Sequence, residues 1–550
     1  MAATTQGAVR DRPAGMTSEE RRVIFASSLG TVFEWYDFYL YGSLAPIIAK
    51  QFFSGVHSSS TAAFIFALLA FAAGFAVRPF GALVFGRLGD IVGRKYTFLV
   101  TMTLMGVGTF FIGVLPSYAQ WGIAAPMVLI GLRLVQGLAL GGEYGGAATY
   151  VAEHAPPGKR GYYTSWIQTT ATLGLFMALL LVIGIQNTMS AEAFADWGWR
   201  IPFLLSLLLL IVSIWIRLSL NESPIFQKMK DEGKASKRPL SEAFGTWSNA
   251  KIAILALLGA TAGEAVIWYG GQFYALFFLT QTLKVQATTA QIMIVVALAL
   301  GTPFFIFFGW LSDKIGRKPI MLLGFLLGVL TYAPISPINI FKGLTHYANP
   351  ALEQALISSP VTVTADPKEC SVQFKMTGTE KFTTSCDTAK AALVASSVNY
   401  QNEAGPAGVA AVVKIGDQTL STTQPDFAAA MKTAIAKHGY PTKADPAQIN
   451  YPMAILLLWI LVIFVTMVYG PIAAWLVELF PTRIRYTGMS LPYHIGNGWF
   501  GGFLPATMFA VAAATGDIYS GLWYVVIVAG MSLVVGALFL PETKDRDITQ

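Results

Sequence analysis

The chain carries two copies of one ten-residue pattern, Gly86-Arg-Leu-Gly-Asp90-Ile-Val-Gly93-Arg94-Lys95 and Gly309-Trp-Leu-Ser-Asp313-Lys-Ile-Gly316-Arg317-Lys318. Both copies fit G-x-L-x-D-x-x-G-R-K, and each follows a long apolar stretch at a matching place in one half of the chain. The match indicates an internal duplication. Such repeats build two helical bundles around a central site in many membrane proteins.

The residue types in this pattern suit a gate where helices meet. The first glycine lets helices approach closely, the aspartate can pair with an arginine or cap a neighbouring helix end, and the later glycine permits a tight turn. A basic loop that only fixes membrane topology would need the charges but not this spacing. We therefore predict gating roles for Gly86, Asp90, Gly93, Arg94, Asp313, Gly316 and Arg317.

The composition predicts an all-α membrane protein. Hydrophobic residues make up 54% of the 550 residues and charged residues only 12%, which is too apolar for a fold whose whole surface meets water. A helix satisfies its own backbone groups in lipid, and about 20 apolar residues span a bilayer core. The apolar stretches predict twelve membrane helices near 23–48, 61–85, 97–115, 124–148, 162–187, 200–220, 251–282, 289–311, 319–337, 451–475, 486–514 and 520–540.

Lysine and arginine are concentrated in every second loop between the predicted helices, for example at Lys159 with Arg160 and at Arg483 with Arg485. By the positive-inside rule these loops and both chain ends are cytoplasmic. The net charge of +7 then reflects orientation rather than binding to nucleic acid. The predicted segments are a cytoplasmic tail 1–22, a six-helix bundle 23–220, a cytoplasmic linker 221–250, helices 7 to 9 in 251–337, an insertion 338–450, helices 10 to 12 in 451–540 and a tail 541–550.

The insertion 338–450 falls on the opposite, periplasmic side and predicts a small extracytoplasmic α+β domain between helices 9 and 10. Alternation in Val361–Thr364 and in 408–415 predicts strands, and Asp426–Lys437 predicts an amphipathic helix. The only two cysteines, Cys370 and Cys386, lie here, and an oxidising exterior favours a disulfide between them. The alternative is two free thiols.

Further motifs accompany the repeat. Arg133-Leu-Val-Gln136-Gly137 fits R-x-x-Q-G, and Glu222-Ser-Pro224 and Pro541-Glu542-Thr543 end the two halves. With the repeat, they resemble the major facilitator superfamily over essentially all helices. Within it, the sequences around Glu34-Trp-Tyr-Asp37, Gly141-Gly142-Glu143 and Leu476–Arg485 resemble the metabolite:proton symporter family, whose members carry organic acids or zwitterions such as proline and betaine. The resemblance implies a 12-helix major facilitator fold of two six-helix halves that works by alternating access.

Charged side chains at bilayer depth are costly, so those in the predicted helices are candidates for function. Glu34 and Asp37 lie three residues apart, on one face of helix 1. Arg133 of helix 4 can hold one of these carboxylates or an anionic substrate, so protonation of the carboxylate would free the arginine. We predict proton coupling at Asp37 and Glu34, and substrate binding at Arg133, Gln136 and Tyr41. The alternative is a permanent Glu34–Arg133 ion pair that only fixes helix packing.

The second half of the chain offers a similar but smaller set of candidate proton-coupling and substrate-binding residues. Glu264 is the only acidic residue well within helix 7, and we predict that it is a third proton-coupling group. We predict substrate contacts for Trp268 and Gln272 of helix 7 and for Asn497 of helix 11, although a tryptophan often serves as an interfacial anchor instead. His494 is expected to be a satisfied bundle residue rather than a proton carrier.

Two further charges, Arg78 on helix 2 and Glu143 on helix 4, lie near the predicted cytoplasmic helix ends, where gate or packing pairs are expected as readily as substrate contacts. The sequence has no nucleotide-binding P-loop, metal-ligand spacing or nucleophile triad. We therefore expect no enzyme, no metal and no cofactor, with the proton as coupling ion.

The residues and the resemblance together predict a secondary active transporter in a bacterial inner membrane that imports a mono-, di- or tricarboxylate by proton symport. Its expected partners are a small metabolite, protons and the lipid bilayer, without nucleic acid, and it is expected to be a monomer. One alternative is a proline- or betaine-like zwitterion as substrate. An alternative of another class is a membrane receptor or interaction protein that binds its ligand through the outer domain.

Overall fold

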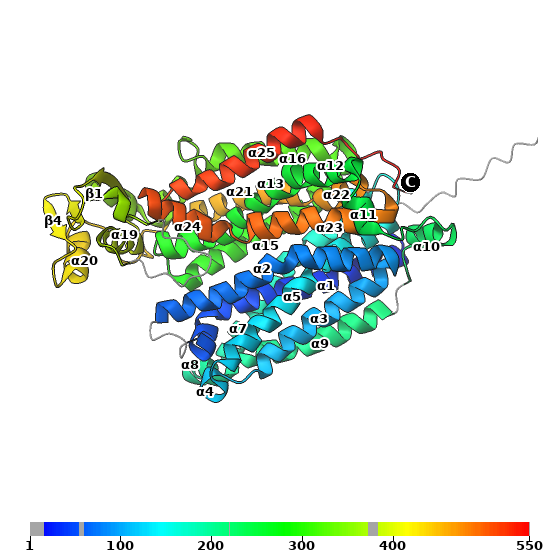
Figure 1. Cartoon of the computed structure of the whole chain (residues 1–550), viewed down its shortest axis with the longest axis horizontal. Helices are drawn as coiled ribbons and strands as arrows, with labels where there is room; N and C mark the ends of the chain where they lie inside the picture. Colours follow the sequence, from blue (N-terminus) through cyan, green and yellow to red (C-terminus); the bar gives the residue numbers. More distant parts are fainter. Residues whose placement is uncertain (1–15, 54–59, 219–220, 372–382, 549–550) are drawn as a thin grey trace, which may run out of the picture.

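The computed structural model describes residues 16–53, 60–218, 221–371 and 383–548. Long helices form two groups that lie alongside each other, the N-terminal group in blue to teal and the C-terminal group in green to red (Figure 1). A small sheet lies at one end of the long axis, called the sheet end here. The opposite end carries α10, α11 and the C-terminus and is called the motif end, because both copies of the repeat lie there.

The N-terminal group is built from long helices joined by short ones. The long helices are α1 (Ser18–Ile48), α2 (Ser60–Ile91), α3 (Arg94–Val114), α5 (Ala124–His154), α6 (Arg160–Gln168), α7 (Thr170–Gln186) and α9 (Arg200–Leu218). The short ones are α4 (Tyr118–Trp121) and α8 (Ala191–Ala193), and the linker to the second group forms α10 (Pro224–Asp231) and α11 (Pro239–Phe244).

The C-terminal group has more interrupted helices. Its members are α12 (Trp247–Ala256), α13 (Ala262–Tyr269), α14 (Ala275–Phe277), α15 (Ala287–Ile315), α16 (Arg317–Tyr332), α21 (Tyr451–Tyr469), α22 (Ile472–Leu479), α23 (Arg485–Ile495), α24 (Leu504–Thr515) and α25 (Trp523–Phe539). The π-helical segments Leu257–Thr261, Gly270–Tyr274 and Phe278–Thr282 join or extend α12 to α14, and another at Gly496–Gly501 follows α23. Two of these segments start at glycines, whose freedom eases a local change of helix pitch.

Within the described residues, eight helical stretches are long and apolar enough to cross a membrane. They are Arg94–Val114, Ala124–His154, Arg160–Gln186, Arg200–Leu218, Trp247–Thr282, Ala287–Ile315, Tyr451–Leu479 and Ser520–Phe539. The predicted helical membrane protein is therefore confirmed, while the layout of twelve spans stays a prediction.

A small α+β unit lies between α16 and α21. It comprises α17 (Ile340–Ala348), α18 (Pro350–Ser358), β1 (Val361–Ala365), α19 (Ser385–Ala395), β2 (Tyr400–Ala404), β3 (Val412–Ile415), β4 (Gln418–Ser421) and α20 (Phe427–Lys437). The strand order is β2-β1-β3-β4, with β1 and β2 parallel and the other pairs antiparallel. The strand expected at Val361–Thr364 and the helix expected at Asp426–Lys437 are present, whereas the strand expected from residue 408 begins only at Val412.

Backbone hydrogen bonds attach this unit to the C-terminal group. The N–H of Tyr400 donates to the carbonyl of Gly516 at 2.7 Å, and the N–H of Ala444 donates to the carbonyl of Lys284 at 3.0 Å. Cys370 and Cys386 are joined, with their sulfur atoms 2.00 Å apart, which agrees with the predicted pairing.

Candidate functional site

Asp37 of α1 lies at the centre of a buried polar cluster in the N-terminal group. Its carboxylate accepts hydrogen bonds from Nη1 of Arg133 at 2.6 Å, Oγ1 of Thr109 at 3.0 Å and Nε2 of Gln136 at 3.2 Å. Only 4% of the Asp37 side chain is exposed. The structure therefore brings together three of the predicted site residues, and adds Thr109, which we did not predict. A threonine in an apolar helix usually bonds to its own backbone, so its sequence carries no distinguishing signal.

One edge of the Arg133 guanidinium, on α5, has no hydrogen-bond partner in the described part of the chain. Nη1 donates hydrogen bonds to Asp37 and also to Oε1 of Gln136 at 3.0 Å, whereas Nε and Nη2 have no hydrogen-bond partner among the described residues. The guanidinium stacks on the ring of Tyr41, 3.8 Å from its centroid, and lines a cavity together with Asp37 and Gln136. Since a guanidinium binds a carboxylate best through two parallel N–H bonds, the Nε and Nη2 edge is suited to bind one.

Glu34 pairs with a different arginine. Its Oε1 lies 3.7 Å from Nη1 of Arg78, which comes from α2 and also lies over the ring of Phe75. The permanent Glu34–Arg133 pair considered from the sequence is thus wrong, because Glu34 lies almost one helical turn before Asp37 and faces another neighbour. Both acid–arginine pairs line the same cavity.

In the C-terminal group, the predicted proton-coupling residue Glu264 binds Asn497, which we predicted to contact substrate. Oε2 of Glu264 accepts a hydrogen bond from Nδ2 of Asn497 at 3.0 Å, while its Oε1 has no partner in the described part of the chain. Nearby, both ring nitrogens of the buried His494 also lack a hydrogen-bond partner among the residues described. The expectation of a satisfied histidine is therefore wrong for this conformation.

Aromatic side chains join the two groups. Trp268 lies 4.6 Å from Trp35 between ring centroids, and the hydroxyl of Tyr39 donates to Oε1 of Gln272 at 3.5 Å. Trp268 is only 1% exposed, so it is no lipid-interface anchor. Trp268 and Gln272 thus lie where the two groups meet, and they are not among the residues that line the cavity at Arg133.

The first copy of the repeat ties the two groups together at the motif end. Asp90 accepts hydrogen bonds from the backbone N–H groups of Tyr486 at 3.3 Å and Thr487 at 2.8 Å, and it pairs with Arg94 at 3.0 Å. The two N–H groups belong to the first turn of α23, so the carboxylate caps that helix. A Cβ on Gly86 would lie 3.0 Å from Cα of Thr487, which shows how closely α2 approaches α23.

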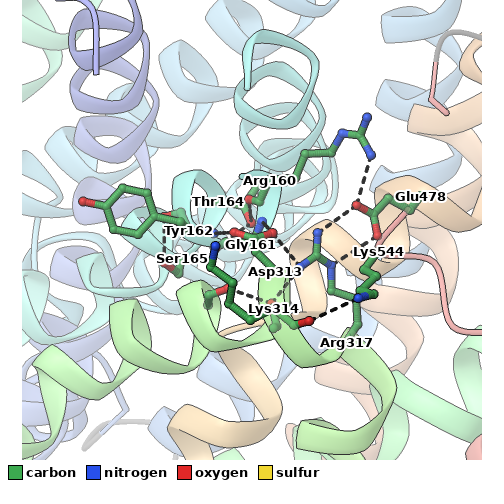
Figure 2. A network of polar contacts seen from close by, with 12 residues as sticks. Arg160, Gly161, Tyr162, Thr164, Ser165, Asp313, Lys314, Arg317, Glu478 and Lys544 are labelled. Atoms are coloured by element: carbon green, nitrogen blue, oxygen red, sulfur yellow. Dashed lines mark hydrogen bonds and ion pairs between the residues drawn. The ribbon is translucent and has the colours of Figure 1, made fainter. Parts of the chain in front are cut away.

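The second copy makes the equivalent contact, with the aspartate now in the C-terminal group and the capped helix in the N-terminal group (Figure 2). Asp313 of α15 accepts hydrogen bonds from the N–H groups of Gly161 at 2.9 Å and Tyr162 at 2.8 Å in the first turn of α6, and it pairs with Arg317 at 2.6 Å. The turn glycines adopt positive φ, +140° at Gly93 and +110° at Gly316, as the sequence led us to expect. All seven predicted gate residues therefore lie at or beside contacts between the groups.

The sequence analysis missed a second internal repeat that completes these contacts. Glu153 binds Arg485 at 2.9 Å, and Glu478 binds Arg160 at 3.2 Å and Arg317 at 3.0 Å, all of them buried. Both acids stand in the pattern E-x-x-P-x-x-x-R, at 153–160 and 478–485, so a comparison of the two halves could have found them. The Glu153–Arg485 and Glu478–Arg160 pairs each join one group to the other, whereas the Glu478–Arg317 pair lies within the C-terminal group.

The motifs that end the two halves act within one group each. Glu222 accepts hydrogen bonds from the N–H of Lys95 at 3.2 and 3.3 Å, in the first turn of α3. Glu542 accepts hydrogen bonds from the N–H groups of Arg317 and Lys318, both at 3.0 Å, in the first turn of α16. These two caps have the same chemistry as those of Asp90 and Asp313 but do not cross between the groups.

Several known proteins are similar to this chain. A putative metabolite transport protein of Haemophilus influenzae is 32% identical over 96% of this chain and 95% of its own length. The proline/betaine transporter of Salmonella typhimurium is 36% identical over 55% of this chain, and that match spans only 62% of the relative. The alpha-ketoglutarate permease of Escherichia coli is 37% identical over 59% of this chain and 74% of the relative.

The fold has solved counterparts as well. The proton:xylose symporter XylE of the major facilitator superfamily superposes with a TM-score of 0.66 over 97% of this chain and 98% of that chain, at 15% identity. The family model described as sugar (and other) transporter matches residues 23–259 and 406–550. These matches confirm the resemblance and the expectation of a transporter family rather than an enzyme family. The chain belongs to the sugar (and other) transporter family, and its fold resembles that of XylE, a symporter of the major facilitator superfamily.

Proposed function

We propose that the chain imports a small carboxylate metabolite by proton symport, and that the carboxylates of Asp37 and of the substrate compete for Arg133. One observation carries the proposal. Buried Arg133 lines a cavity and uses Nη1 to hold Asp37, while its Nε and Nη2 have no hydrogen-bond partner among the described residues. The relative named alpha-ketoglutarate permease supports an organic acid as substrate.

The competition follows from charge balance at Arg133. Ionised Asp37 neutralises the guanidinium, so a second carboxylate gains little by binding. When Asp37 takes up a proton, the arginine keeps its charge and the incoming substrate carboxylate becomes its counter-ion. Substrate and proton therefore favour each other's binding, and loss of one favours release of the other. Glu34 with Arg78, and Glu264 with Asn497, are further proton-coupling candidates in the same scheme.

Alternating access fits the contacts at the motif end. We assign this end to the cytoplasm, the sheet unit 338–450 to the periplasm and twelve membrane helices to two halves of a monomer in a bacterial inner membrane. The caps made by Asp90 and Asp313 hold the cytoplasmic side closed in the present conformation. Opening would break these contacts, while the glycines in the interrupted helices of the second half let those helices bend.

Uptake of labelled mono-, di- and tricarboxylates and betaines into proteoliposomes, with and without an inward proton gradient, tests the proposal. We expect gradient-driven accumulation of at least one carboxylate by the wild type. Asp37→Asn should lose accumulation but retain substrate exchange, because exchange needs no net proton transfer. Transport that ignores the gradient and is unaffected by Asp37→Asn would contradict the proposal.

A zwitterion is the second candidate substrate, favoured by the aromatic side chains around Trp35 and Trp268. A quaternary ammonium binds well over such rings, while Arg133 would hold the zwitterion's carboxylate. The relative named proline/betaine transporter supports this possibility. The betaine arm of the uptake panel decides between the two, and Trp268→Ala should then impair betaine uptake more than carboxylate uptake.

A receptor that binds its ligand through the sheet unit can be distinguished by excision. The N–H of Asn450 donates to the carbonyl of Tyr347 at 2.8 Å, so residues 348–449 can be replaced by a short linker without moving the helices. A transporter should retain uptake after this excision. Loss of ligand binding in a variant that still folds would favour the receptor.

A further inference from the structure

Glu143 of α5 is a buried acid for which the proposed transport scheme has no role so far. Its side chain is 0% exposed, and neither carboxylate oxygen has a hydrogen-bond partner among the described residues. Two other buried acids are well satisfied: Asp37 accepts three hydrogen bonds, and Asp90 accepts two from backbone N–H groups and also pairs with Arg94. A buried ionised carboxylate without donors is costly, so Glu143 is not built as a permanently charged packing residue.

Gly30 of α1 makes room for Glu143 and for an arginine beside it. A Cβ at Gly30 would lie 1.9 Å from Nη2 of Arg217 and 2.7 Å from Oε1 of Glu143. Any other residue at this position would push the two side chains apart. Among the described residues, Arg217 forms only long hydrogen bonds, to the carbonyls of Phe98 at 3.3 Å and Ala26 at 3.4 Å, so its guanidinium can shift toward the acid.

This site continues the row of acid–arginine pairs toward the motif end. Glu143 lies about 15 Å beyond Arg133 along α5, and Gly30 lies about 10 Å before Asp37 along α1. Glu34 and its partner Arg78 lie between these two levels.

The charged groups that act on Glu143 come from three other helices. They are Arg217 of α9, Glu34 of α1 and Arg78 of α2. Tyr486 of α23 and Tyr150 of α5 in turn interact with Arg217. Helices α1, α2 and α9 thus each contribute a charged or titratable group beside the acid.

We propose that Glu143 is a second proton-binding site, which receives the transported proton from the Asp37 level and passes it toward the cytoplasm. The inference rests on the proposed proton symport. Each transfer breaks an O–H bond on one carboxyl group and forms an O–H bond on the next, with Glu34 lying on the path. Once ionised, Glu143 takes Arg217 as its counter-ion.

Glu143→Gln tests this role in purified protein and in proteoliposomes. Addition of substrate to the purified variant should still draw a proton from the buffer, as in the wild type, because Asp37 is intact. Gradient-driven accumulation should fall at least tenfold, whereas exchange should stay within about threefold of the wild type. Glu143→Asp keeps an ionisable group and should restore part of the accumulation, which a purely structural role does not predict.

Gly30→Ala provides a test that keeps Glu143 itself. The added methyl group should displace Arg217 and Glu143 and lower accumulation without abolishing exchange. The matched control is Gly42→Ala on the same helix, where a Cβ meets no atom within 4 Å and transport should be unchanged. If Glu143→Gln fails to fold, the comparison of accumulation and exchange between Gly30→Ala and Gly42→Ala tests the inference instead.

Two results would overturn the inference, and both can be distinguished from results that would refute the proposed proton symport. Accumulation by Glu143→Gln at the wild-type rate would show that no proton passes through this acid. Equal loss of exchange and accumulation in Glu143→Gln, Glu143→Asp and Gly30→Ala would show a structural role. If the wild type itself takes up no proton with substrate, the symport proposal is the one that fails.

Discussion

Asp90→Asn should open the motif end of the molecule. The carboxylate of Asp90 joins α2 to the first turn of α23 through two backbone N–H groups, at 3.3 and 2.8 Å, and is 0% exposed. Hydrogen bonds to a charged group contribute about 1.5–3 kcal/mol each, and charge at a helix N-terminus adds about 0.3–1 kcal/mol. The asparagine keeps one acceptor oxygen but loses the charge, so the contact should weaken by about 2–3 kcal/mol.

This loss applies to the closed conformation, because opening separates α2 from α23. The ratio of closed to open molecules should therefore fall by about 30- to 150-fold. Spin labels on cysteines placed at Leu218 and Phe539 would report the change as a longer distance. Both side chains are exposed, end corresponding helices of the two groups and lie at the motif end.

Glu222→Gln is the matched control. Glu222 also caps a helix, through the backbone N–H of Lys95, but it caps α3 within its own group, so its removal should leave the label distance unchanged. The reasoning is refuted if Asp90→Asn leaves the distance distribution as in the wild type. It is refuted equally if Glu222→Gln lengthens the distance as much.

Three other perturbations have defined outcomes. Arg133→Lys keeps the charge but loses the planar two-donor edge, so the apparent affinity for a carboxylate in uptake assays should fall at least tenfold; unchanged affinity would exclude this edge as the binding group. Replacing Cys370 and Cys386 together by serine should destabilise the sheet unit by about 3 kcal/mol, seen as faster hydrogen exchange confined to residues 340–450, with uptake retained. Excision of residues 348–449 should leave proton-driven uptake within a few-fold of the wild type, and its complete loss in a folded variant would contradict the assignment of the substrate site to the helices.

The repeat and the membrane helices were accessible from the sequence because they depend on local patterns. G-x-L-x-D-x-x-G-R-K predicted both helix caps and both positive-φ turns, and apolar length predicted the helical membrane fold. The strand expected from residue 408 begins four positions later in the structure, because Gly408 adopts φ of +74° in a turn. The polar edge strand β2 was missed, since most of its residues are exposed and show no alternation.

The candidate site was predictable in its residue types but not in its pairing. Asp37, Arg133 and Gln136 stood out as polar groups in apolar helices, and the structure brings them together. Which arginine faces Glu34 depends on how α1 and α2 are rotated against each other, and no sequence pattern states that rotation. That Glu143 accepts no hydrogen bond from the described residues is likewise a property of packing around Gly30, visible only with the neighbouring helices in place.

Proton movement coupled to substrate entry tests the central proposal most directly. Proteoliposomes would enclose a pH-sensitive dye, with equal pH on both sides, and would receive a carboxylate that the wild type accumulates under a gradient. We predict that the lumen of wild-type liposomes acidifies as substrate enters, and that Asp37→Asn liposomes exchange substrate without acidification. Substrate entry into wild-type liposomes with no change of internal pH would contradict proton symport at Asp37 and Arg133.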